Sequence, residues 1–212
     1  MKTLAWIPAW QSSDVEIKED NLIYEGFYKV KKLRLRHKCF SGEWSPWVVR
    51  EQVCRTNAAA VLLWDPQQDK VVLIEQLRIG LVGQDTEVSP WLLENVAGLI
   101  DPGESPEQTA LREAQEEAGY TIKELLKIGD YYPTPGGFSE MLSVFCGIID
   151  VQDEGGIQGN AHEHEDIKVH VFSTRTILTA LEKGHLRTSA STVIALQWLA
   201  NKIRNNHGKT SL

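Results

Sequence analysis

The 212-residue chain is long enough for one domain, or for one domain with a small accessory element, and its 42% hydrophobic residues suffice for a sizeable core. Its formal net charge of −7 and isoelectric point near 5.4 argue against a nucleic-acid partner, because a surface that follows phosphates is basic. No run approaches the roughly 18 apolar residues that a membrane-spanning helix needs, so we expect no membrane partner.

The first residues, MKTLAWIPAWQSS, lack the charged, apolar and small-residue regions of a secretion signal. The three cysteines, Cys39, Cys54 and Cys146, are odd in number and far apart, which is typical of reduced thiols. Both observations favour a cytoplasmic protein.

An N-terminal sheet is expected next. Apolar and basic residues partly alternate in LIYEGFYKVKKLRLRHKCF (22–40), SGEWSP then turns the chain, and WVVREQV follows as a second strand. We therefore predict an N-terminal β element over residues 1–55. Its aromatic and basic strands are too few to form an independent core, so we expect them to pack on a partner.

From residue 57 the strands are short and strongly apolar, as in strands buried on both faces of a sheet. We expect them in NAAAVLLWD (57–65), KVVLIEQLRIG (70–80), WLLENVAG (91–98), MLSVFCGIID (141–150) and IKVHVFS (167–173). Helical periodicity appears in SPEQTALREAQEEAG (105–119), TRTILTALEKG (174–184) and ASTVIALQWLANKIRNN (190–206). The prediction is an α/β domain over residues 56–205, with a mixed sheet between helices, followed by a tail at 206–212.

The first of these helices has well-marked ends. Ser105 suits the N-cap, Pro106 suits the first turn, and Gln108 stands where a capping box needs its partner. Gly119 suits the left-handed residue that ends a helix, so the helix should span about 106–118. One stripe of it is expected to hold four residues, which are Ala110, Leu111, Ala114 and Ala118.

Three glutamates fall together beside this stripe. Glu113, Glu116 and Glu117 lie within an arc of about 100°, because each residue turns the helix by about 100°. A solvated charged face is the alternative interpretation. However, like charges at this spacing repel, and only Arg112 offers a local counter-charge. Mg²⁺ prefers clusters of carboxylate oxygens together with substrate phosphates, so the glutamates predict a divalent metal site.

The same stretch resembles the Nudix box, GX5EX7REUXEEXGU, in which U is usually a bulky apolar residue. The fixed positions all match, with Gly98, Glu104, Arg112, Glu113, Glu116, Glu117 and Gly119 in place. The small Ala114 and the aromatic Tyr120 are mild departures at the U positions. The resemblance implies an α/β/α sandwich that uses Mg²⁺, with Mn²⁺ as the alternative, to hydrolyse a nucleoside diphosphate linked to another moiety.

The resemblance also implies roles for individual residues. Glu113 and Glu117 are expected as metal ligands, Glu116 as a ligand or its support, and the Ala97 carbonyl as a further ligand. The other box residues, Gly98, Glu104, Arg112 and Gly119, are expected to shape the loop and the helix, partly through an Arg112–Glu104 salt bridge.

Pro135 lies sixteen residues after Gly119, within YYPTPGGFSE, and a proline at this spacing resembles the mark of the ADP-ribose pyrophosphatases. A plain turn is the alternative. The likeness to the bacterial members of that group runs from YEGFYKVKKLRLRHKCFSGE to STVIALQWL. It implies hydrolysis of ADP-ribose to AMP and ribose 5-phosphate, with another nucleotide sugar such as GDP-mannose as the first alternative. A Nudix-fold binding module without catalysis is the second.

In that group the N-terminal sheet is exchanged across a homodimer and helps to form the pocket for adenosine and ribose, so the resemblance implies a homodimer here. It implies substrate contacts for Phe27 and Tyr28 beside the adenine, for Arg50, Glu51, Arg55 and Arg78 along the cleft, and for Thr134, Pro135, Gly136 and Glu140 in a loop. Arginine suits this task because its planar fork binds phosphate oxygens bidentately, although each arginine is equally consistent with a plain surface charge.

A general base is expected in GNAHEHEDIKVHV (159–171), which carries Glu163, Glu165 and Asp166 on a glycine-flanked loop before a strand. A histidine metal site or a solvated loop are the alternatives from the residues alone. The segment resembles the AxExEDI pattern of the family, which implies Glu163 as the base and Glu165 as a group near the metal. His162 and His164 are expected to have no chemical role.

Overall fold

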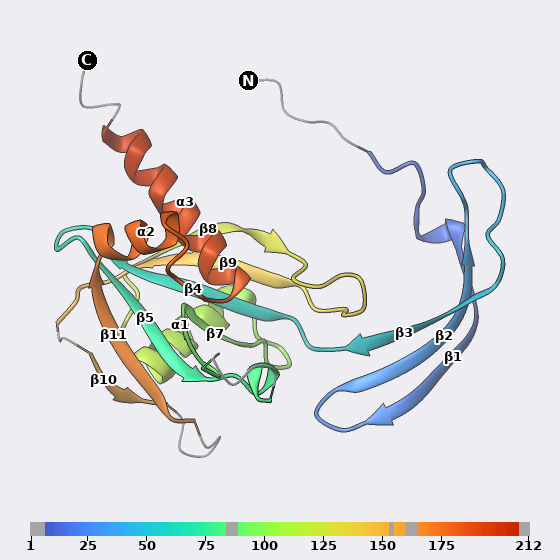
Figure 1. Cartoon of the computed structure of the whole chain (residues 1–212), viewed down its shortest axis with the longest axis horizontal. Coiled ribbons are helices and arrows are strands. Elements are labelled where there is room, and N and C mark those ends of the chain that lie inside the picture. Colours follow the sequence, from blue (N-terminus) through green and yellow to red (C-terminus); the bar gives the residue numbers. More distant parts are fainter. Residues whose placement is uncertain (1–6, 84–88, 153–154, 160–164, 208–212) are drawn as a thin grey trace. The chain divides into compact units, whose positions relative to one another are not determined.

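The computed structural model describes residues 7–83, 89–152, 155–159 and 165–207 (Figure 1). Contacts within the chain divide it into two units. The first comprises Met1–Arg55 and Thr134–Glu140, and the second comprises Thr56–Pro133 and Met141–Leu212.

The first unit contains a three-stranded antiparallel sheet in the order β1-β2-β3. Its strands are β1 (Val15–Glu25), β2 (Lys29–His37) and β3 (Val48–Cys54), and a short 3₁₀ turn, η1 (Ser12–Asp14), precedes them. The predicted sheet is confirmed, but 22–40 is not one strand, because the chain reverses at Gly26. A Cβ there would lie 2.4 Å from the Tyr24 hydroxyl, so the Tyr24 ring occupies the space beside Gly26.

Stacked cations and tryptophans join β2 to the segment before β3. The Arg36 guanidinium lies 4.7 Å from the Trp44 ring centroid and 4.9 Å from that of Trp47. Lys38 stands over Trp44 and Lys18 over Trp47, at 4.7 and 5.7 Å. Cation–π contacts of this kind contribute about 0.5–1 kcal/mol each at exposed sites. They order a sheet whose described residues bury one large apolar side chain, Leu33.

The second unit is built on a mixed sheet with the strand order β10-β11-β5-β4-β9-β8, in which β6 pairs with β5 and β7 with β4. The strands are β4 (Ala58–Asp65), β5 (Lys70–Leu77), β6 (Trp91–Glu94), β7 (Val96–Leu99), β8 (Glu124–Tyr131), β9 (Leu142–Ile148), β10 (Gly155–Gln158) and β11 (Ile167–Ser173). β4 and β9 run parallel, and the other pairs are antiparallel. The 3₁₀ turn η2 (Ile79–Leu81) follows β5.

Helices cover both faces of this sheet, as Figure 1 shows. α1 (Pro106–Ala118) packs on one face, while α2 (Thr174–Glu182) and α3 (Ala190–His207) pack on the other. β4 is buried on both faces, with Val61 in the core under α1 and Leu62 in the core under α3. The predicted α/β/α sandwich is confirmed. None of the helices in the described part of the chain is long and apolar enough to span a membrane.

Candidate active site: glutamates of α1 against β7

The α1 helix has the ends that the sequence predicts. Ser105 Oγ accepts a hydrogen bond from Gln108 N at 3.2 Å, and Gln108 Oε1 accepts one from Ser105 N at 2.8 Å. Gly119 adopts the left-handed conformation, with φ at 73°. Ala110, Ala114 and Ala118 are buried and let the helix approach the sheet closely. Leu111, the fourth residue of the predicted stripe, is 44% exposed.

Close packing of α1 brings Glu113 against the backbone of β7. A Cβ at Gly98 would lie 1.7 Å from Glu113 Oε1, so the carboxylate occupies space that only glycine leaves open. Burial raises the pKa of Glu113, against the lowering effect of the Arg112 guanidinium beside it. Gly98 therefore shapes the site directly.

Glu117 lies one turn further along the helix and is 2% exposed. Its Oε2 accepts a hydrogen bond from the backbone N–H of Ala97 at 3.0 Å. Burial, the largest cause, raises the pKa of Glu117 to about 8, and the charges of Glu113 and Glu165 add to this effect. The Ala97 N–H and the Arg78 charge oppose it. Three predicted metal-site glutamates thus act on one another electrostatically.

The raised pKa of Glu117 predicts that metal-free protein loses stability as the pH rises. A carboxyl with a higher pKa in the folded state stabilises the fold below its ordinary pKa of 4.5, and this contribution is lost as the pH rises through about 8. Denaturant unfolding with a chelator should show the free energy of unfolding falling over this range, by at most about 1.4 kcal/mol per pH unit for one proton. Glu117→Gln should flatten the slope, and an unchanged slope in that variant would contradict the assignment to Glu117.

Arg112 connects the box loop to the helix. Its Nε and one terminal nitrogen each donate to Glu104 at 3.0 Å, which is the predicted salt bridge. Arg112 also donates to the Leu99 carbonyl at 3.2 Å, to Glu113 at 2.7 Å and to Glu116 at 3.1 Å. The bonds from Arg112, assisted by Thr109, lower the pKa of Glu104 to about 2. The loop is therefore fastened to the helix by an ion pair that stays charged at neutral pH.

Arg78 faces the cluster from the end of β5. Its Nε donates to Glu94 Oε2 at 2.5 Å, and Glu94, the last residue of β6, is buried. The Arg78 side chain remains 40% exposed. Sequence reasoning predicted Arg78 but missed Glu94. The available signal was a carboxylate at the end of an apolar strand, where burial requires a partner.

The donor set of the cluster fits a hard divalent cation. Its oxygens belong to carboxylates that repel one another, and burial disfavours the charge on Glu113 and Glu117, so a bound cation would relieve both effects. Among the described residues, no set of three or more His, Cys, Asp or Glu side chains already converges on one point. One Glu113 oxygen and one Glu116 oxygen are instead bonded to Arg112.

The loop predicted to hold the general base is described at its two ends. Glu163, with His162 and His164, lies outside the described residues, so its assignment stays a prediction. Glu165 is described, and its charge raises the pKa of both Glu113 and Glu117, so it lies near the cluster as expected. A Cβ at Gly159 would lie 2.7 Å from the Glu165 carbonyl oxygen, so the two ends of the loop approach closely.

The first unit brings together part of the predicted substrate set. The rings of Phe27 and Tyr28 meet edge to face with centroids 5.0 Å apart, and the Arg55 guanidinium lies 5.6 Å from the Tyr28 centroid. Arg55 also pairs with Glu140 at 3.4 Å. These four side chains form one connected group, which we call the Tyr28 group.

The remaining predicted contacts in this unit lie elsewhere. Arg50 is exposed and donates to the Val49 carbonyl at 2.8 Å, and its neighbour Glu51 belongs to the opposite face of β3. Thr134, Pro135 and Gly136 lie in a turn in which the Thr134 carbonyl accepts hydrogen bonds from Gly137 N and Phe138 N. The turn that was the alternative interpretation is therefore present, and substrate contacts from Thr134, Pro135 and Gly136 stay a prediction.

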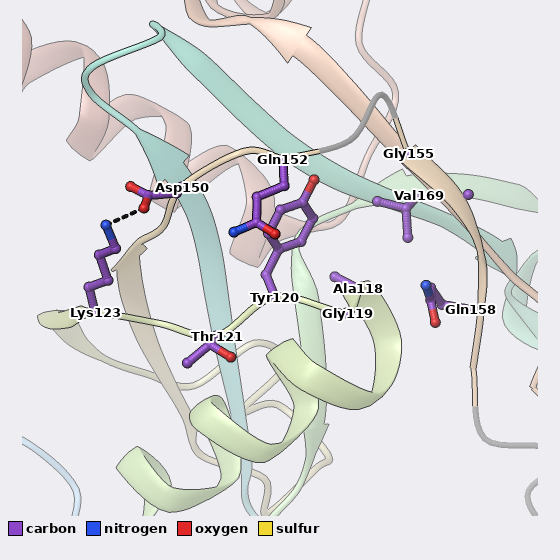
Figure 2. A pocket seen from close by; sticks show the side chains of 11 residues that line it. Ala118, Gly119, Tyr120, Thr121, Lys123, Asp150, Gln152, Gly155, Gln158 and Val169 are labelled. Carbon is purple, nitrogen blue, oxygen red and sulfur yellow. Dashed lines mark ion pairs between the residues drawn. The ribbon is translucent and has the colours of Figure 1, made fainter.

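A cavity of about 260 Å³ lies at the C-terminal end of α1 (Figure 2). Its wall includes Tyr120, Gln152 and Gln158, and Lys123 forms an ion pair with Asp150 across one side. The glutamates of the α1 cluster do not line it. The cavity is therefore separate from the candidate site, and sequence reasoning did not predict it.

Comparisons with known proteins agree with this geometry. A family model described as NUDIX domain matches residues 55–191. The chain is 46% identical over 187 residues to an ADP-ribose pyrophosphatase of Escherichia coli (strain K12), covering 88% of each chain. It is 40% identical over 199 residues to an ADP-ribose pyrophosphatase of Haemophilus influenzae, covering 93% of this chain and 91% of that one.

More distant similarities extend beyond these two proteins. A GDP-mannose pyrophosphatase of Cronobacter sakazakii is 32% identical over 191 residues, covering 89% of this chain and 96% of its own. A crystal structure of an ADP compounds hydrolase superposes with a TM-score of 0.67 at 22% identity, covering 91% of this chain and 96% of that one. At that identity the structural likeness supports the fold alone.

Proposed function

The chain belongs to the NUDIX domain family of hydrolases, and we propose that it hydrolyses ADP-ribose to AMP and ribose 5-phosphate with the help of Mg²⁺. The observation that carries this proposal is that the chain is 40–46% identical in sequence to ADP-ribose pyrophosphatases over most of each chain. The α1 cluster supports it, because cleavage of a diphosphate calls for a concentrated oxygen-donor site.

Two alternatives remain weaker. Hydrolysis of GDP-mannose is supported by the GDP-mannose pyrophosphatase of Cronobacter sakazakii. Its identity to this chain is 32%, compared with 46% for the ADP-ribose pyrophosphatase of Escherichia coli. A binding module without catalysis has no need for buried, mutually repelling carboxylates, which cost stability unless they serve a ligand.

Each residue of the cluster has a defined part in this proposal. Glu113, Glu117 and the Ala97 carbonyl would hold the metal, with Glu116 and Glu165 as further ligands or supports. Mg²⁺, when bound, neutralises diphosphate charge and makes a water molecule more acidic.

Two further residues would act on the water and the substrate. Glu163 would accept the proton of the attacking water. The Arg78 guanidinium would donate to a phosphate oxygen while its Nε stays bonded to Glu94.

The Tyr28 group would receive the adenine and ribose of the substrate. Phe27 is 79% exposed, so its ring face is available for stacking on a base. Arg55 and Glu140 supply hydrogen-bond donors and acceptors next to the Tyr28 ring. Arg50, Glu51, Thr134, Pro135 and Gly136 complete the proposed set.

ADP-ribose is expected to exceed GDP-mannose by at least about tenfold in kcat/KM, a difference of roughly 1.4 kcal/mol in transition-state binding. The reason is the higher similarity to the ADP-ribose pyrophosphatases. The measurement is product release with Mg²⁺ from a panel that also contains NADH, diadenosine polyphosphates and 8-oxo-dGTP. Equal turnover of ADP-ribose and GDP-mannose would remove the substrate assignment and leave the family membership untouched.

A homodimer is expected because the N-terminal sheet lacks a core of its own. Its described residues bury Leu33 alone among the large apolar side chains, while Ile17, Ile23 and Tyr24 on β1 stay more than half exposed. Light scattering at micromolar concentration should give the mass of two chains. Ile17→Lys should weaken the dimer, whereas Ile157→Lys, at an exposed position on β10, should leave it intact. A monomeric wild type would refute this expectation.

We also propose a cellular compartment and a type of partner for the protein. The three cysteines are free thiols, which supports a reducing compartment such as the cytoplasm. The net charge of −7 supports a small-molecule substrate and no nucleic-acid partner.

A further inference from the structure

Asn95 occupies an unusual place in the sheet of the second unit. β4 and β5 pair with each other only over Leu63–Asp65 and Lys70–Val72, and beyond that point they diverge. The segment 91–99 crosses the gap, pairing with β5 through β6 and with β4 through β7. Asn95 is the residue at which the chain passes from one strand partner to the other.

Because neither ladder includes Asn95, hydrogen bonds from α3 take its place. Asn95 N donates to Thr192 Oγ1 at 2.9 Å. Asn95 Oδ1 lies 2.9 Å from the hydroxyls of both Ser191 and Thr192, which can donate to it. Asn95 is 1% exposed and Thr192 fully buried, so water does not compete for these bonds.

The hydroxyl cluster extends to both sides of this contact. Ser189 Oγ lies 3.0 Å from Ser191 Oγ and 2.9 Å from Thr192 Oγ1, and Thr188 donates to the Leu93 carbonyl at 2.6 Å. One turn further along α3, the buried side chains are apolar, as at Leu196 and Leu199. Hydrogen bonds depend on direction, so the buried polar groups fix the position of the 91–99 segment relative to α3. Apolar contacts alone would allow the segment to shift along the helix.

The fixed segment carries two groups of the candidate site. Glu94, immediately before Asn95, accepts the hydrogen bond from Arg78. Ala97, two residues after it, donates its N–H to Glu117. A shift of the crossing segment would therefore move both Glu94 and the Ala97 peptide relative to their partners.

We propose that Asn95, held by Thr192 and Ser191, is a positioning residue that fixes the β6–β7 crossing so that the Ala97 peptide and Glu94 meet Glu117 and Arg78. The proposal rests on the proposed function, in which Ala97 and Glu117 belong to the metal site. Asn95 itself does not reach the reacting groups, because its side chain bonds to α3 on the opposite side of the sheet from α1.

The test is a matched pair of substitutions at Thr192. Thr192→Val keeps the shape and removes the hydroxyl, whereas Thr192→Ser keeps the hydroxyl. Calorimetric titration with Mg²⁺ should show binding about tenfold weaker in Thr192→Val, at the lower end of the effect of removing groups that orient metal ligands. Thr192→Ser should bind Mg²⁺ like the wild type. Ser191→Ala, a milder change, should shift affinity in the same direction by less and covers the case in which Thr192→Val fails to fold.

Leu199→Ala is the control for general loosening of α3. It removes a fully buried side chain from the same helix without touching Asn95, so it should lower the melting temperature at least as much and leave Mg²⁺ affinity unchanged. Equal affinity in Thr192→Val and wild type, or an equal loss in Leu199→Ala, would overturn the positioning role alone. Absence of Mg²⁺ binding by the wild type would overturn the proposed function and this inference with it.

Discussion

Glu163→Gln is expected to lower kcat by about 10² to 10⁴ while leaving Mg²⁺ affinity close to that of the wild type. A glutamine amide cannot accept the proton of the attacking water, so the loss falls on the chemical step. The measurements are kcat at saturating ADP-ribose and its dependence on Mg²⁺ concentration. Because Glu163 is proposed as the base and not as a ligand, extra Mg²⁺ should restore little of the rate.

Neighbours on the same loop provide the controls for this substitution. Asp166→Asn changes an exposed carboxylate three residues away and should keep most of the activity. Glu165→Gln should alter metal affinity, since the charge of Glu165 acts on Glu113 and Glu117. A Glu163→Gln variant with near-normal kcat, or one rescued by Mg²⁺, would move the role of base to Glu165.

Most elements of the second unit could be predicted because each carries a local signal. β4 and β9 are continuous apolar runs, and α1 has its cap residues and its glycine in sequence. β8 and β10 were missed for the opposite reason. The sequence of β8, ELLKIGDY, contains charged residues and a glycine, and β10 begins with two glycines. Both are edge strands, which tolerate such residues because one side of each strand pairs with no other strand of the sheet.

In the candidate site, too, features with a local sequence signal could be predicted and the others could not. The Glu113 and Glu117 pair follows from helical spacing, and the Arg112–Glu104 ion pair follows from the resemblance to the box. Contacts between distant segments could not be read from spacing. The Glu94–Arg78 bond requires the register of β5 with β6.

The hydrogen bonds between α3 and Asn95 also could not be predicted from the sequence. The segment WLLENVAG looks like one uninterrupted strand, and only the divergence of β4 and β5 shows that the chain changes strand partner at Asn95. Hydrogen bonds that take the place of strand pairing can be predicted only when the pairing of the neighbouring strands is known.

Glu117→Gln is expected to weaken Mg²⁺ binding by at least about tenfold, because it removes a charged oxygen donor from the site, and even the loss of groups that merely support ligands has effects of this size. The fold should survive, since the glutamine oxygen can still accept the hydrogen bond from Ala97 N and the volume is unchanged. The substitution also replaces a buried carboxyl whose pKa is raised to about 8, so metal-free protein should gain stability at alkaline pH.

Recovery by Mg²⁺ separates Glu117→Gln from Glu163→Gln. Part of the rate lost in Glu117→Gln should return at high Mg²⁺, because the defect is in occupancy, whereas the defect in Glu163→Gln is in proton transfer. Glu116→Gln is the matched control, since the Glu116 side chain is 41% exposed and bonded to Arg112, so its loss should shift the titration less. A Glu117→Gln variant that titrates with Mg²⁺ like the wild type would show that the glutamates of α1 are not the metal site, and the acidic face of the helix would then need another explanation.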